Sequence, residues 1–419
     1  MSPHTISLYV SNVTPLLTGW YDPQTADPMG LRATEIKGLW RWWARAFIAG
    51  ALYERNMLKG SSSGDILKRP TKTESELISS LVGKKMGLGY AGERGSEQSR
   101  FTIRIEPLRV STPVPSRQLS KFTNWREFTN WQRLKLLSLG GGSPECILPG
   151  AEFKISVTLT RGRFGDAESL AFRVLLITLQ LCGVGKAARR GFGSLDLTRI
   201  VGYDDIPNSL HDLLDETYAL TSSLVERETH QPSRGLDHDE LPPMACVSKA
   251  IVKDVPVSSI YEISSGSSAP SPTGNPGSFP TGGNIREWSL IHNFFVRMGR
   301  CRVIHGSPSC FDQIRKSYAA WFLGLPREQR DTGYKSSVDR RASPIFVAFH
   351  SRRNIFGNRA FMSILLSSDW PQKIHWKDSG GPRGINVNKS QIVNDYNVCF
   401  NELSTYLKNV NLGLSRVWP

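Results

Sequence analysis

Long hydrophobic runs are missing from this chain of 419 residues, and their absence argues against a membrane protein. The longest apolar stretch, around residues 174–184, is too short to span a bilayer, and Arg173 and Lys186 flank it. The first ten residues, MSPHTISLYV, place no basic residues ahead of a long apolar core, so we expect no signal peptide. The sequence therefore predicts no membrane partner.

Paired cysteines are missing as well. The six cysteines, at positions 146, 182, 246, 301, 310 and 399, are scattered and never form a Cys-x-x-Cys pair. This pattern argues against zinc frameworks and disulfide scaffolds, and it predicts a reducing, cytoplasmic location.

Acidic residues are in the minority. The chain has 52 Lys and Arg against 37 Asp and Glu, which gives a formal net charge of +15. Such a balance indicates an anionic partner, nucleic acid first among them. The length is sufficient for two hydrophobic cores, so we expect two domains.

The densest basic segment is RATEIKGLWRWWARAF, residues 32–47, for which we predict a helix over 34–49 with Thr34 as N-cap and Gly50 as its end. Two neighbouring faces of this helix are apolar and cationic, formed respectively by Ile36, Trp40, Trp43 and Phe47 and by Lys37, Arg41 and Arg45. Cations four residues apart repel each other, so they favour a polyanionic ligand. The alternative is a solvated basic face beside a core stripe. Trp42 lies on neither face; it either stacks on a base, caps the core or contacts a neighbouring subunit.

A glycine-rich loop, GVGKAARRGFG at residues 183–193, follows a predicted helix over 167–182. Glycines let the backbone approach a ligand closely, and the cations supply charge, so the loop fits phosphate oxygens. Its candidate residues are Gly185, Lys186, Arg189, Arg190, Gly191 and Gly193.

Known nucleotide loops do not match this segment. A Walker A loop fails because Gln180 and Ala187 stand where glycine and Ser or Thr are needed. The GxGxxA pattern of dinucleotide sites is present, but RRGFGS argues against the helix that must follow it. We therefore expect no cofactor and no metal. A third basic cluster, DRRASP at residues 339–344, has Arg340 and Arg341 either paired inside the protein or facing the same ligand as the loop.

The element order of residues 1–205 predicts a ferredoxin-like domain, the topology of RNA-recognition modules. Predicted strands at 5–13, 100–105, 153–159 and 194–201 alternate with the two helices as βαββαβ. An insertion at 109–150 contains FTNWREFTNW, whose aromatic residues we expect to pack on the domain, with base stacking as the alternative. Residues 206–244 connect to a second α+β domain, 245–419. Its expected strands are 245–252, 344–349 and 361–366, its expected helices 285–298, 311–323 and 391–408, and its Ser/Pro/Gly-rich loop 262–283 is expected to be disordered.

Five motifs together resemble the RAMP superfamily, and within it the family of subunit one of the type III-B CRISPR effector called Cmr. They are TPLLTGW (14–20), the tryptophan-rich helix, RRGFGSL (189–195), LGLP (323–326) and RRASPI (340–345). A departure is Tyr90-Ala91-Gly92, where relatives typically carry a Phe-Gly pair.

The resemblance implies two ferredoxin-like folds in a non-catalytic subunit at one end of a ribonucleoprotein for antiviral defence. Its implied partners are other RAMP subunits, the 3′ region of the guide RNA (crRNA) and the single-stranded target RNA that it helps to capture. The phosphate contacts that it implies fall on Arg32, Lys37, Arg41, Arg45, Lys186, Arg189 and Arg190, with Arg340 and Arg341 as further candidates. We expect the helix and loop cations to converge in one groove for an unpaired strand.

Two other function classes remain as alternatives. Some RAMP proteins cut guide precursors without a metal, using a histidine; His305 beside Arg300 and Arg302 is the best candidate here, followed by His4 and His350. A protein–protein adaptor would explain the tryptophans but not the cations. The run 237–240, DHDE, reads as an exposed acidic linker rather than a metal site, because four adjacent side chains point in different directions.

Overall fold

The structure is a computed structural model that describes residues 4–22, 24–93, 95–137, 142–265, 285–296, 319–325, 327–329, 332–338, 340–357, 359–378 and 381–419. His305, most of the expected helix 311–323 and most of the segment 262–283 lie outside these ranges. Helices alternate with antiparallel sheets in the described residues, which confirms the α+β class.

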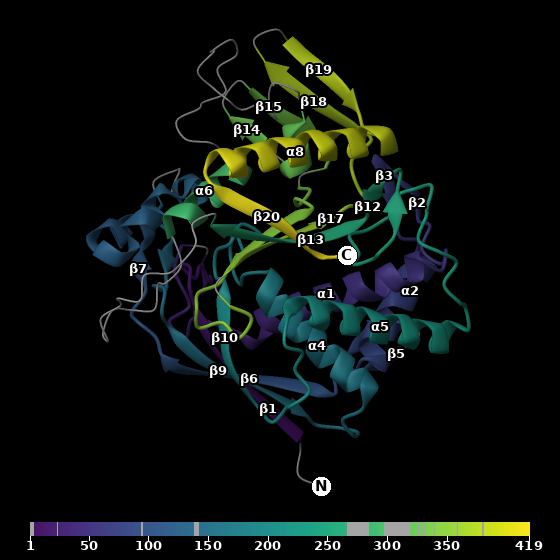
Figure 1. Ribbon diagram of the computed structural model, residues 1–419, viewed down its shortest axis with the longest axis horizontal. Helices are drawn as coiled ribbons and strands as arrows, with labels where there is room; N and C mark the ends of the chain where they lie inside the picture. Colours follow the sequence, from purple (N-terminus) through teal and green to yellow (C-terminus); the bar gives the residue numbers. More distant parts are fainter. Residues whose placement is uncertain are drawn as a thin grey trace.

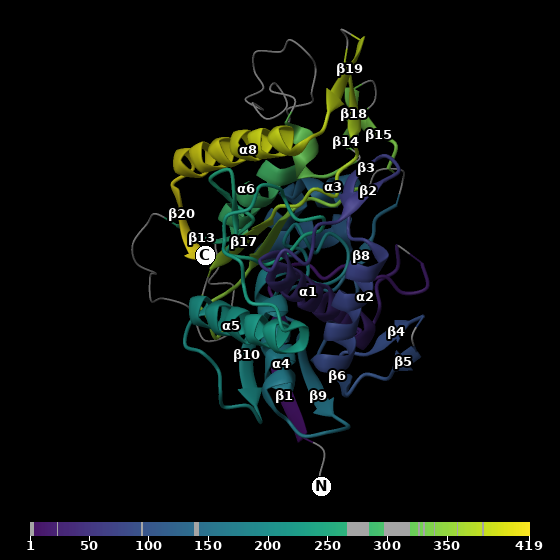
Figure 2. The ribbon, with the colours of Figure 1, turned by 90° about the vertical axis from the view of Figure 1, so that its right-hand side faces the viewer.

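The amino-terminal half is built on a four-stranded antiparallel sheet (Figure 1). In the spatial order β10-β1-β9-β6 its strands are β10 (Leu195–Val201), β1 (His4–Asn12), β9 (Glu152–Leu159) and β6 (Phe101–Arg109). Side chains of β9 alternate between half-buried and buried, as its polar and apolar residues alternate in sequence. Helices α1 (Ala33–Tyr53) and α4 (Asp166–Leu181) lie on one face of this sheet (Figure 2). The expected βαββαβ order of elements is thus present.

The carboxy-terminal half repeats this order on a second antiparallel sheet. In the spatial order β16-β17-β13-β20 its strands are β16 (Ile345–Phe349), β17 (Ala360–Leu365), β13 (Ser258–Ser265) and β20 (Leu412–Trp418). Helix α6 (Ile285–Val296) follows the first of these strands along the chain, and α8 (Lys389–Asn409) precedes the last. All residues of β16 and β17 are buried, because α4 of the other half lies against them.

Several expected elements of this half are corrected by the structure. Residues 245–250 form no strand, and only Ile251–Val252 (β11) pairs, with Val255–Pro256 (β12). Strands β13 and β20 were not expected, and residues 262–265 of the expected loop belong to β13. Of the expected helix 311–323, the described part forms a 3₁₀ turn, Ala320–Leu323 (η4).

The remaining elements lie between these strands and helices. Helix α5 (Leu210–Thr229) occupies the expected connecting segment and packs against α1 and α4. A third sheet, in the order β14-β15-β18-β19, consists of Arg327–Gln329, Thr332–Ser336, Lys373–Asp378 and Gly381–Asn386. Between α1 and β6 lie β2 (Ser61–Ser63), β3 (Ile66–Arg69), α2 (Lys72–Ser80), the π-helical turn η1 (Leu81–Lys85), β4 (Tyr90–Gly92) and β5 (Gly95–Glu97). The insertion contains β7 (Val114–Pro115), η2 (Ser116–Lys121), η3 (Thr123–Asn130), α3 (Gln132–Leu137) and β8 (Glu145–Cys146).

Helix α1 is longer than the sequence predicted. It begins one residue before Thr34, so Thr34 is not its N-cap, and it continues past Gly50 to Tyr53. Gly50 serves a different purpose: a Cβ there would collide with the carbonyl oxygen of Val247. The backbone N–H of Val247 donates to the carbonyl oxygen of Ala46 at 2.9 Å. The segment 245–250 therefore packs against this helix.

The aromatic run of the insertion packs inward, as the first interpretation predicted. Trp125, Phe128 and Trp131 are buried, whereas Phe122 is 37% exposed. The Trp131 ring stacks on His292 of α6 with ring centroids 4.5 Å apart. The insertion is thus fastened to the carboxy-terminal half.

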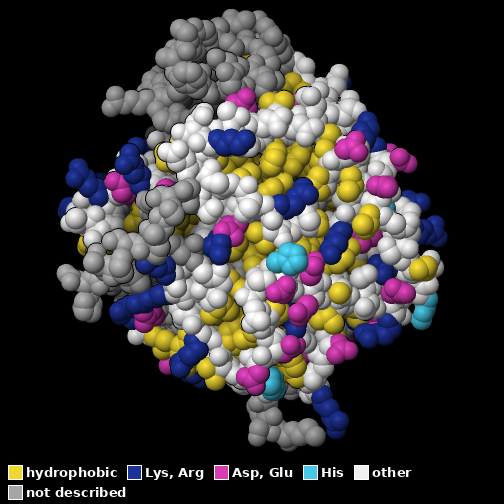
Figure 3. Space-filling model, in the orientation of Figure 1, with side chains coloured by type: hydrophobic (Ala, Val, Ile, Leu, Met, Phe, Trp, Pro, Cys, Tyr) yellow, Lys and Arg dark blue, Asp and Glu magenta, His cyan; other side chains and the backbone are white. Residues whose placement is uncertain are grey.

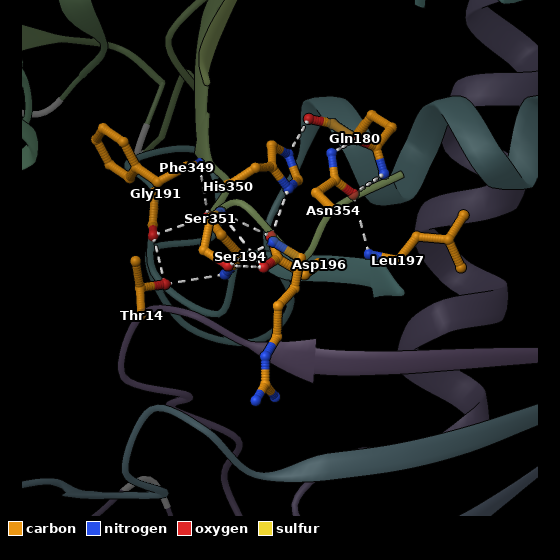
Figure 4. Close-up of polar contacts among 11 residues, drawn as sticks. Thr14, Gln180, Gly191, Ser194, Asp196, Leu197, Phe349, His350, Ser351 and Asn354 are labelled. Carbon is orange, nitrogen blue, oxygen red and sulfur yellow. Dashed lines mark hydrogen bonds and ion pairs between the residues drawn. The ribbon is translucent and has the colours of Figure 1, made fainter. Parts of the chain in front are cut away.

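A buried polar network joins the two halves (Figure 4). Asp196 of β10 accepts hydrogen bonds from the backbone N–H of Ser351, at 3.0 Å, and from the Ser351 hydroxyl. Its Oδ1 lies 3.3 Å from Nδ1 of His350, and both side chains are fully buried. Nε2 of His350 lies 2.8 Å from the carbonyl oxygen of Gln180, and the Gln180 side chain accepts from the amide of Asn354 at 2.7 Å. The network fixes β16 against α4 and β10, and so positions the surface described next.

Candidate nucleic-acid interface

Two of the predicted cations of α1 are engaged within the protein. Nη2 of Arg32 lies 2.6 Å from Oε1 of Glu35, and its Nε lies 3.8 Å from Oδ2 of Asp27. Lys37 donates to the carbonyl oxygen of Phe101 at 3.3 Å, and burial lowers the pKa of its ammonium group. A phosphate would have to compete with these contacts.

Arg41 has a hydrogen-bond partner within the protein, whereas Arg45 has none among the described residues. Arg41 donates to the carbonyl oxygen of Gly89 at 2.5 Å. Arg45 is exposed and has no hydrogen bond or ion pair to any other described residue. Partial desolvation, and after it the charge of Arg41, lower the pKa of Arg45. A cation without a counter-charge beside another cation is unfavourable, and an anionic ligand would relieve it.

Close packing explains the glycines of the loop. A Cβ at Gly185 would lie 2.6 Å from the carbonyl oxygen of Leu17, one at Gly191 would collide with the Phe349 ring, and one at Gly193 with the loop's own backbone. All three glycines have positive φ, which other residues rarely adopt. The N–H of the residue after Gly185 donates to Leu17 at 2.9 Å. The glycines are therefore accounted for without a phosphate.

Lys186 and Arg190 of the loop face other parts of the protein. Lys186 is near Asp22, whose charge opposes the lowering of the lysine's pKa by burial. Arg190 donates from Nη2 to the carbonyl oxygen of Leu323 at 2.7 Å, and its guanidinium lies 5.4 Å from the centre of the Phe295 ring. The guanidinium of Arg190 thus holds the loop against the carboxy-terminal half, and its contact with RNA stays a prediction.

Arg189 is where the loop meets α1. Its guanidinium carbon lies 5.2 Å from the ring centre of Trp42 and 4.3 Å from that of Phe346. Its Nη1 donates to the carbonyl oxygen of Ser343 at 2.8 Å. Burial lowers the pKa of Arg189 to about 10, so it stays charged at neutral pH. Helix α1 and the loop thus meet at Trp42 and Arg189, while the convergence of their cations on RNA stays a prediction.

The adjacent residues Arg340 and Arg341 have opposite environments. Arg341 pairs with Asp369, Nη2 to Oδ1 at 2.6 Å, and its guanidinium lies 4.2 Å from the centre of the Trp370 ring. Arg340 is exposed and has no hydrogen bond or ion pair to another described residue. Its charge, after desolvation, lowers the pKa of Arg133 on helix α3 of the insertion. Arg341 thus follows the structural alternative, and Arg340 remains open to a ligand.

Residues of α1, of the glycine-rich loop and of the RRASP motif line one pocket of about 360 Å³, which we call the arginine pocket. Its lining consists of Trp42, Ile66, Arg69, Arg189, Met244, Ala245, Val338, Arg340, Arg341, Ala342 and Asp369. Four arginines against one aspartate leave a formal charge of +3. Because the aspartate is already paired with Arg341, the field in the pocket is positive and suits an anion.

Of the eleven residues that line the pocket, the sequence interpretation named four as candidate site residues: Trp42, Arg189, Arg340 and Arg341. Arg69 at the end of β3 and Met244 both line the pocket, and Arg133 lies close enough to Arg340 to feel its charge. Arg69 is exposed and, like Arg340, has no side-chain partner among the described residues. None of the three stands in a basic or glycine-rich motif, so no local signal marks them.

The candidate histidines give no support to a catalytic role. His350 is fully buried in the network between the halves, so no substrate reaches it. His4 is exposed at the start of β1, where its ring lies 4.8 Å from that of Phe164. His305 lies outside the described residues. In the run 237–240, His238 stacks on Tyr53 with centroids 4.2 Å apart.

Metal-binding clusters and membrane spans are both missing from the described ranges. No group of three or more His, Cys, Asp or Glu side chains there could hold a metal ion. No described helix combines the length and apolar character needed to cross a membrane.

Acidic side chains are unevenly distributed on one face of the molecule (Figure 3). On the face drawn there, Asp and Glu side chains gather in the lower central part, over α5. That helix carries Asp212, Asp215 and Glu216 within its first two turns. Two of these carboxylates are paired, Asp215 with Lys249 at 2.9 Å and Glu216 with Arg173 at 2.5 Å.

Comparisons with known proteins agree with the motifs. Residues 10–196 match the model of the RAMP superfamily. A segment of 175 residues is 27% identical to the CRISPR system Cmr subunit Cmr1-1 of Pyrococcus furiosus, and it covers 40% of this chain and 41% of that protein. The sequence match thus spans well under half the length of this curated relative.

Solved structures extend the likeness over the whole chain. The crystal structure of Cmr1 from Pyrococcus furiosus (apo form) is 16% identical, with 99% of this chain and 98% of that chain covered and a TM-score of 0.50. A chain in the cryo-EM structure of the type III-B Cmr-beta bound to cognate target RNA is 15% identical, with 94% and 99% covered and a TM-score of 0.52. At these identities the likeness shows the fold, which is that of Cmr1.

Proposed function

We propose that this RAMP superfamily protein, which resembles subunit one of the type III-B CRISPR complex Cmr, is a non-catalytic RNA-binding subunit of such a complex. In this proposal it contacts the 3′ region of the guide RNA and helps to capture target RNA. Each half is then a ferredoxin-like domain, which the shared strand order of the two sheets supports. The scattered cysteines keep the cytoplasm as the predicted location.

The observation that carries this proposal is the arginine pocket. Residues from α1, β3, the glycine-rich loop and the RRASP motif, more than 290 positions apart in sequence, line the same pocket. Two of its four arginines, Arg69 and Arg340, have no counter-charge among the described residues. Clustering like charges costs free energy, so a ligand that offsets the cost is the simplest physical reason for the arrangement.

A single strand of RNA fits this electrostatic pattern. Arg45 is exposed on α1, three residues after the half-buried Trp42, so the helix can continue a phosphate track that begins in the pocket. Cations aligned along a backbone bind it irrespective of base sequence. Assembly beside target RNA is supported by the similar fold of a chain in the Cmr-beta complex bound to cognate target RNA.

The first prediction tests this function with a charge reversal. Arg69→Glu/Arg340→Glu should weaken the binding of a 20-nucleotide single-stranded RNA at least about tenfold at 150 mM salt, because each lost contact removes a counterion-release contribution. Fluorescence anisotropy with the full-length protein measures the dissociation constant. The matched control is Arg163→Glu/Arg227→Glu, which changes the net charge equally at exposed positions outside the pocket.

Equal losses in both variants would show only a general effect of charge and would overturn the assignment of RNA to the pocket. The ribonuclease alternative is checked in the same preparation. We expect no cleavage of repeat-containing RNA with EDTA or with magnesium, and cleavage that His305→Ala abolishes would replace the non-catalytic proposal.

A further inference from the structure

The arginine pocket has the volume of a small-ligand site. Its volume of about 360 Å³ lies at the low end of the range typical of such pockets, roughly 300–1,000 Å³. Apolar and aromatic side chains form part of its lining, namely Trp42, Ile66, Met244, Ala245, Val338 and Ala342. A phosphate backbone alone needs no apolar wall, so the pocket is built for more than charge.

We propose that the arginine pocket holds a single unstacked nucleotide of the bound RNA, with its base against Trp42 and Met244 and its phosphate between Arg69 and Arg340. This inference rests on the proposed function, because it assumes that RNA is the ligand. It adds that one base leaves the strand and is held by the protein.

The four arginines divide into two that build the wall and two that are free. Arg341 is held by Asp369 at 2.6 Å, and Arg189 by Ser343 at 2.8 Å. Arg69 and Arg340 are exposed and have no such partner among the described residues. A phosphate gains most from guanidinium groups that lose no existing bond, so the free pair is its place.

Asp369 is the acidic residue of the pocket lining. Its carboxylate lines the pocket beside Arg341 and accepts from Nη2 of that arginine and from the hydroxyl of Ser367, both at 2.6 Å. Because Arg341 offsets its charge, this aspartate leaves the field of the pocket positive. The free guanidinium groups of Arg69 and Arg340 therefore set the place of the phosphate.

Trp42 is held in place before any ligand arrives. Its ring lies 5.1 Å from that of Phe346 and 5.4 Å from that of Trp43, edge-on in the second case. The Met244–Ala245 wall is followed by Val247, whose N–H is bonded to Ala46 of α1. A rigid aromatic surface loses little entropy when a base contacts it, which is what base-binding sites require.

A thermodynamic cycle separates the contribution of the base to the binding affinity from that of the phosphate. The full-length protein and Trp42→Leu are each titrated with a 12-nucleotide uridine RNA and with a 12-residue abasic ribose-phosphate strand, by anisotropy at one salt concentration. Removal of the bases should weaken binding to the unsubstituted protein about tenfold, the order expected of one base on an aromatic ring. Trp42→Leu should bind both strands with nearly the affinity that the unsubstituted protein has for the abasic one.

Two further variants keep the cycle interpretable. Trp42→Phe retains a ring, so its discrimination between the strands should lie between those of the other two proteins. Phe122→Leu removes an aromatic side chain that is 37% exposed on the insertion, and it should discriminate as the unsubstituted protein does.

The possible results distinguish the two proposals. Equal affinity of the unsubstituted protein for both strands overturns the single-nucleotide site while RNA binding stands. Loss of discrimination in Phe122→Leu but not in Trp42→Leu moves base contact to the insertion and also overturns it. Failure of the unsubstituted protein to bind either strand overturns the proposed function itself.

Discussion

At the residue scale, adjacent arginines in this protein make different contacts. Arg189 lines the arginine pocket, while Arg190 donates to Leu323 in the carboxy-terminal half; Arg340 is free, while Arg341 pairs with an aspartate. Neighbouring side chains in extended or looped backbone point in different directions. The sequence could therefore locate these basic motifs but could not decide which member of each pair meets a ligand.

Two glycines of α1 give the second prediction, on stability. Gly38 is exposed, and beyond its own helix no atom lies within 4 Å of the place that a Cβ would take, so Gly38→Ala should raise the unfolding temperature, since Ala favours a helix by about 0.5–1 kcal/mol. Gly50→Ala places its methyl group against the carbonyl oxygen of Val247 and should lower that temperature, by a cost of about 1–3 kcal/mol or more. Differential scanning fluorimetry compares both with the unsubstituted protein.

The two substitutions should shift the unfolding temperature in opposite directions, and this difference tests the packing on α1. Both substitutions add the same methyl group to the same helix, so propensity alone would stabilise both. If Gly50→Ala is as stable as Gly38→Ala, segment 245–250 is not packed on α1 as described, and the Met244–Ala245 wall of the pocket loses its support.

At the element scale, pattern strength decided what could be predicted. Strands β6 and β9 alternate with period two, and α4 is a long apolar helix, so their positions followed from sequence. Residues 245–250 are equally apolar, but they are buried against α1 and pair with no strand. A segment buried against a helix and a strand buried in a sheet have the same apolar composition, so the composition of residues 245–250 could not tell them apart. The strand prediction was wrong for this reason.

Strands β13 and β20 were missed for different reasons. β13, SSIYEISS, leads directly into a Ser/Pro/Gly-rich segment, which hid its end. β20, LGLSRVW, is a sheet edge with only its first and last residues buried, so it lacks a regular apolar alternation. Only pairing with distant strands reveals them. β13 pairs with β17 and with β20, and each of these lies more than 90 residues after it.

A buried histidine is one of the residues that attach the insertion. Nδ1 of His292 lies 2.7 Å from the carbonyl oxygen of Arg190, and its Nε2 accepts from the backbone N–H of Arg133 at 3.2 Å. One nitrogen must donate and the other accept, which the neutral imidazole does. Burial, opposed by the bond to Arg190, lowers the pKa of His292 to about 3.

The third prediction follows from that pKa. An unfolded chain binds a proton at this histidine near pH 6.5, the folded protein only near pH 3. Between these values the unfolded state binds more protons, so His292 makes the protein less stable as pH falls, by at most about 1.4 kcal/mol per pH unit. His292→Gln should flatten the decline of the unfolding temperature between pH 6.5 and pH 4.

The control for this experiment is His211→Gln, an exposed histidine on α5. It should leave the slope of unfolding temperature against pH unchanged. A slope that is equally steep in His292→Gln and in the unsubstituted protein would show that the acid sensitivity arises elsewhere.

At the scale of the whole molecule, the arginine pocket exists only because the two halves are joined. Trp42, Arg69 and Arg189 come from the first half, and Arg340 and Arg341 from the second. The net charge of +15 predicts an anionic partner class, but it cannot say where that partner binds. The contacts between the halves run over more than 150 positions in sequence, and no local pattern encodes them.

The fourth prediction tests that union through Asp196, whose carboxylate accepts from Ser351 and lies beside His350 at the buried junction. Asp196→Asn keeps the size of the side chain but turns an N–H₂ group toward a donor, which should cost about 1–3 kcal/mol. Because both halves share the junction, we expect one unfolding transition at a lower temperature in calorimetry, with RNA affinity reduced before unfolding begins. Asp204→Asn, exposed just beyond β10, should change neither quantity. Two separate transitions in Asp196→Asn, with RNA affinity unchanged, would show that the halves fold independently and that the pocket does not depend on their junction.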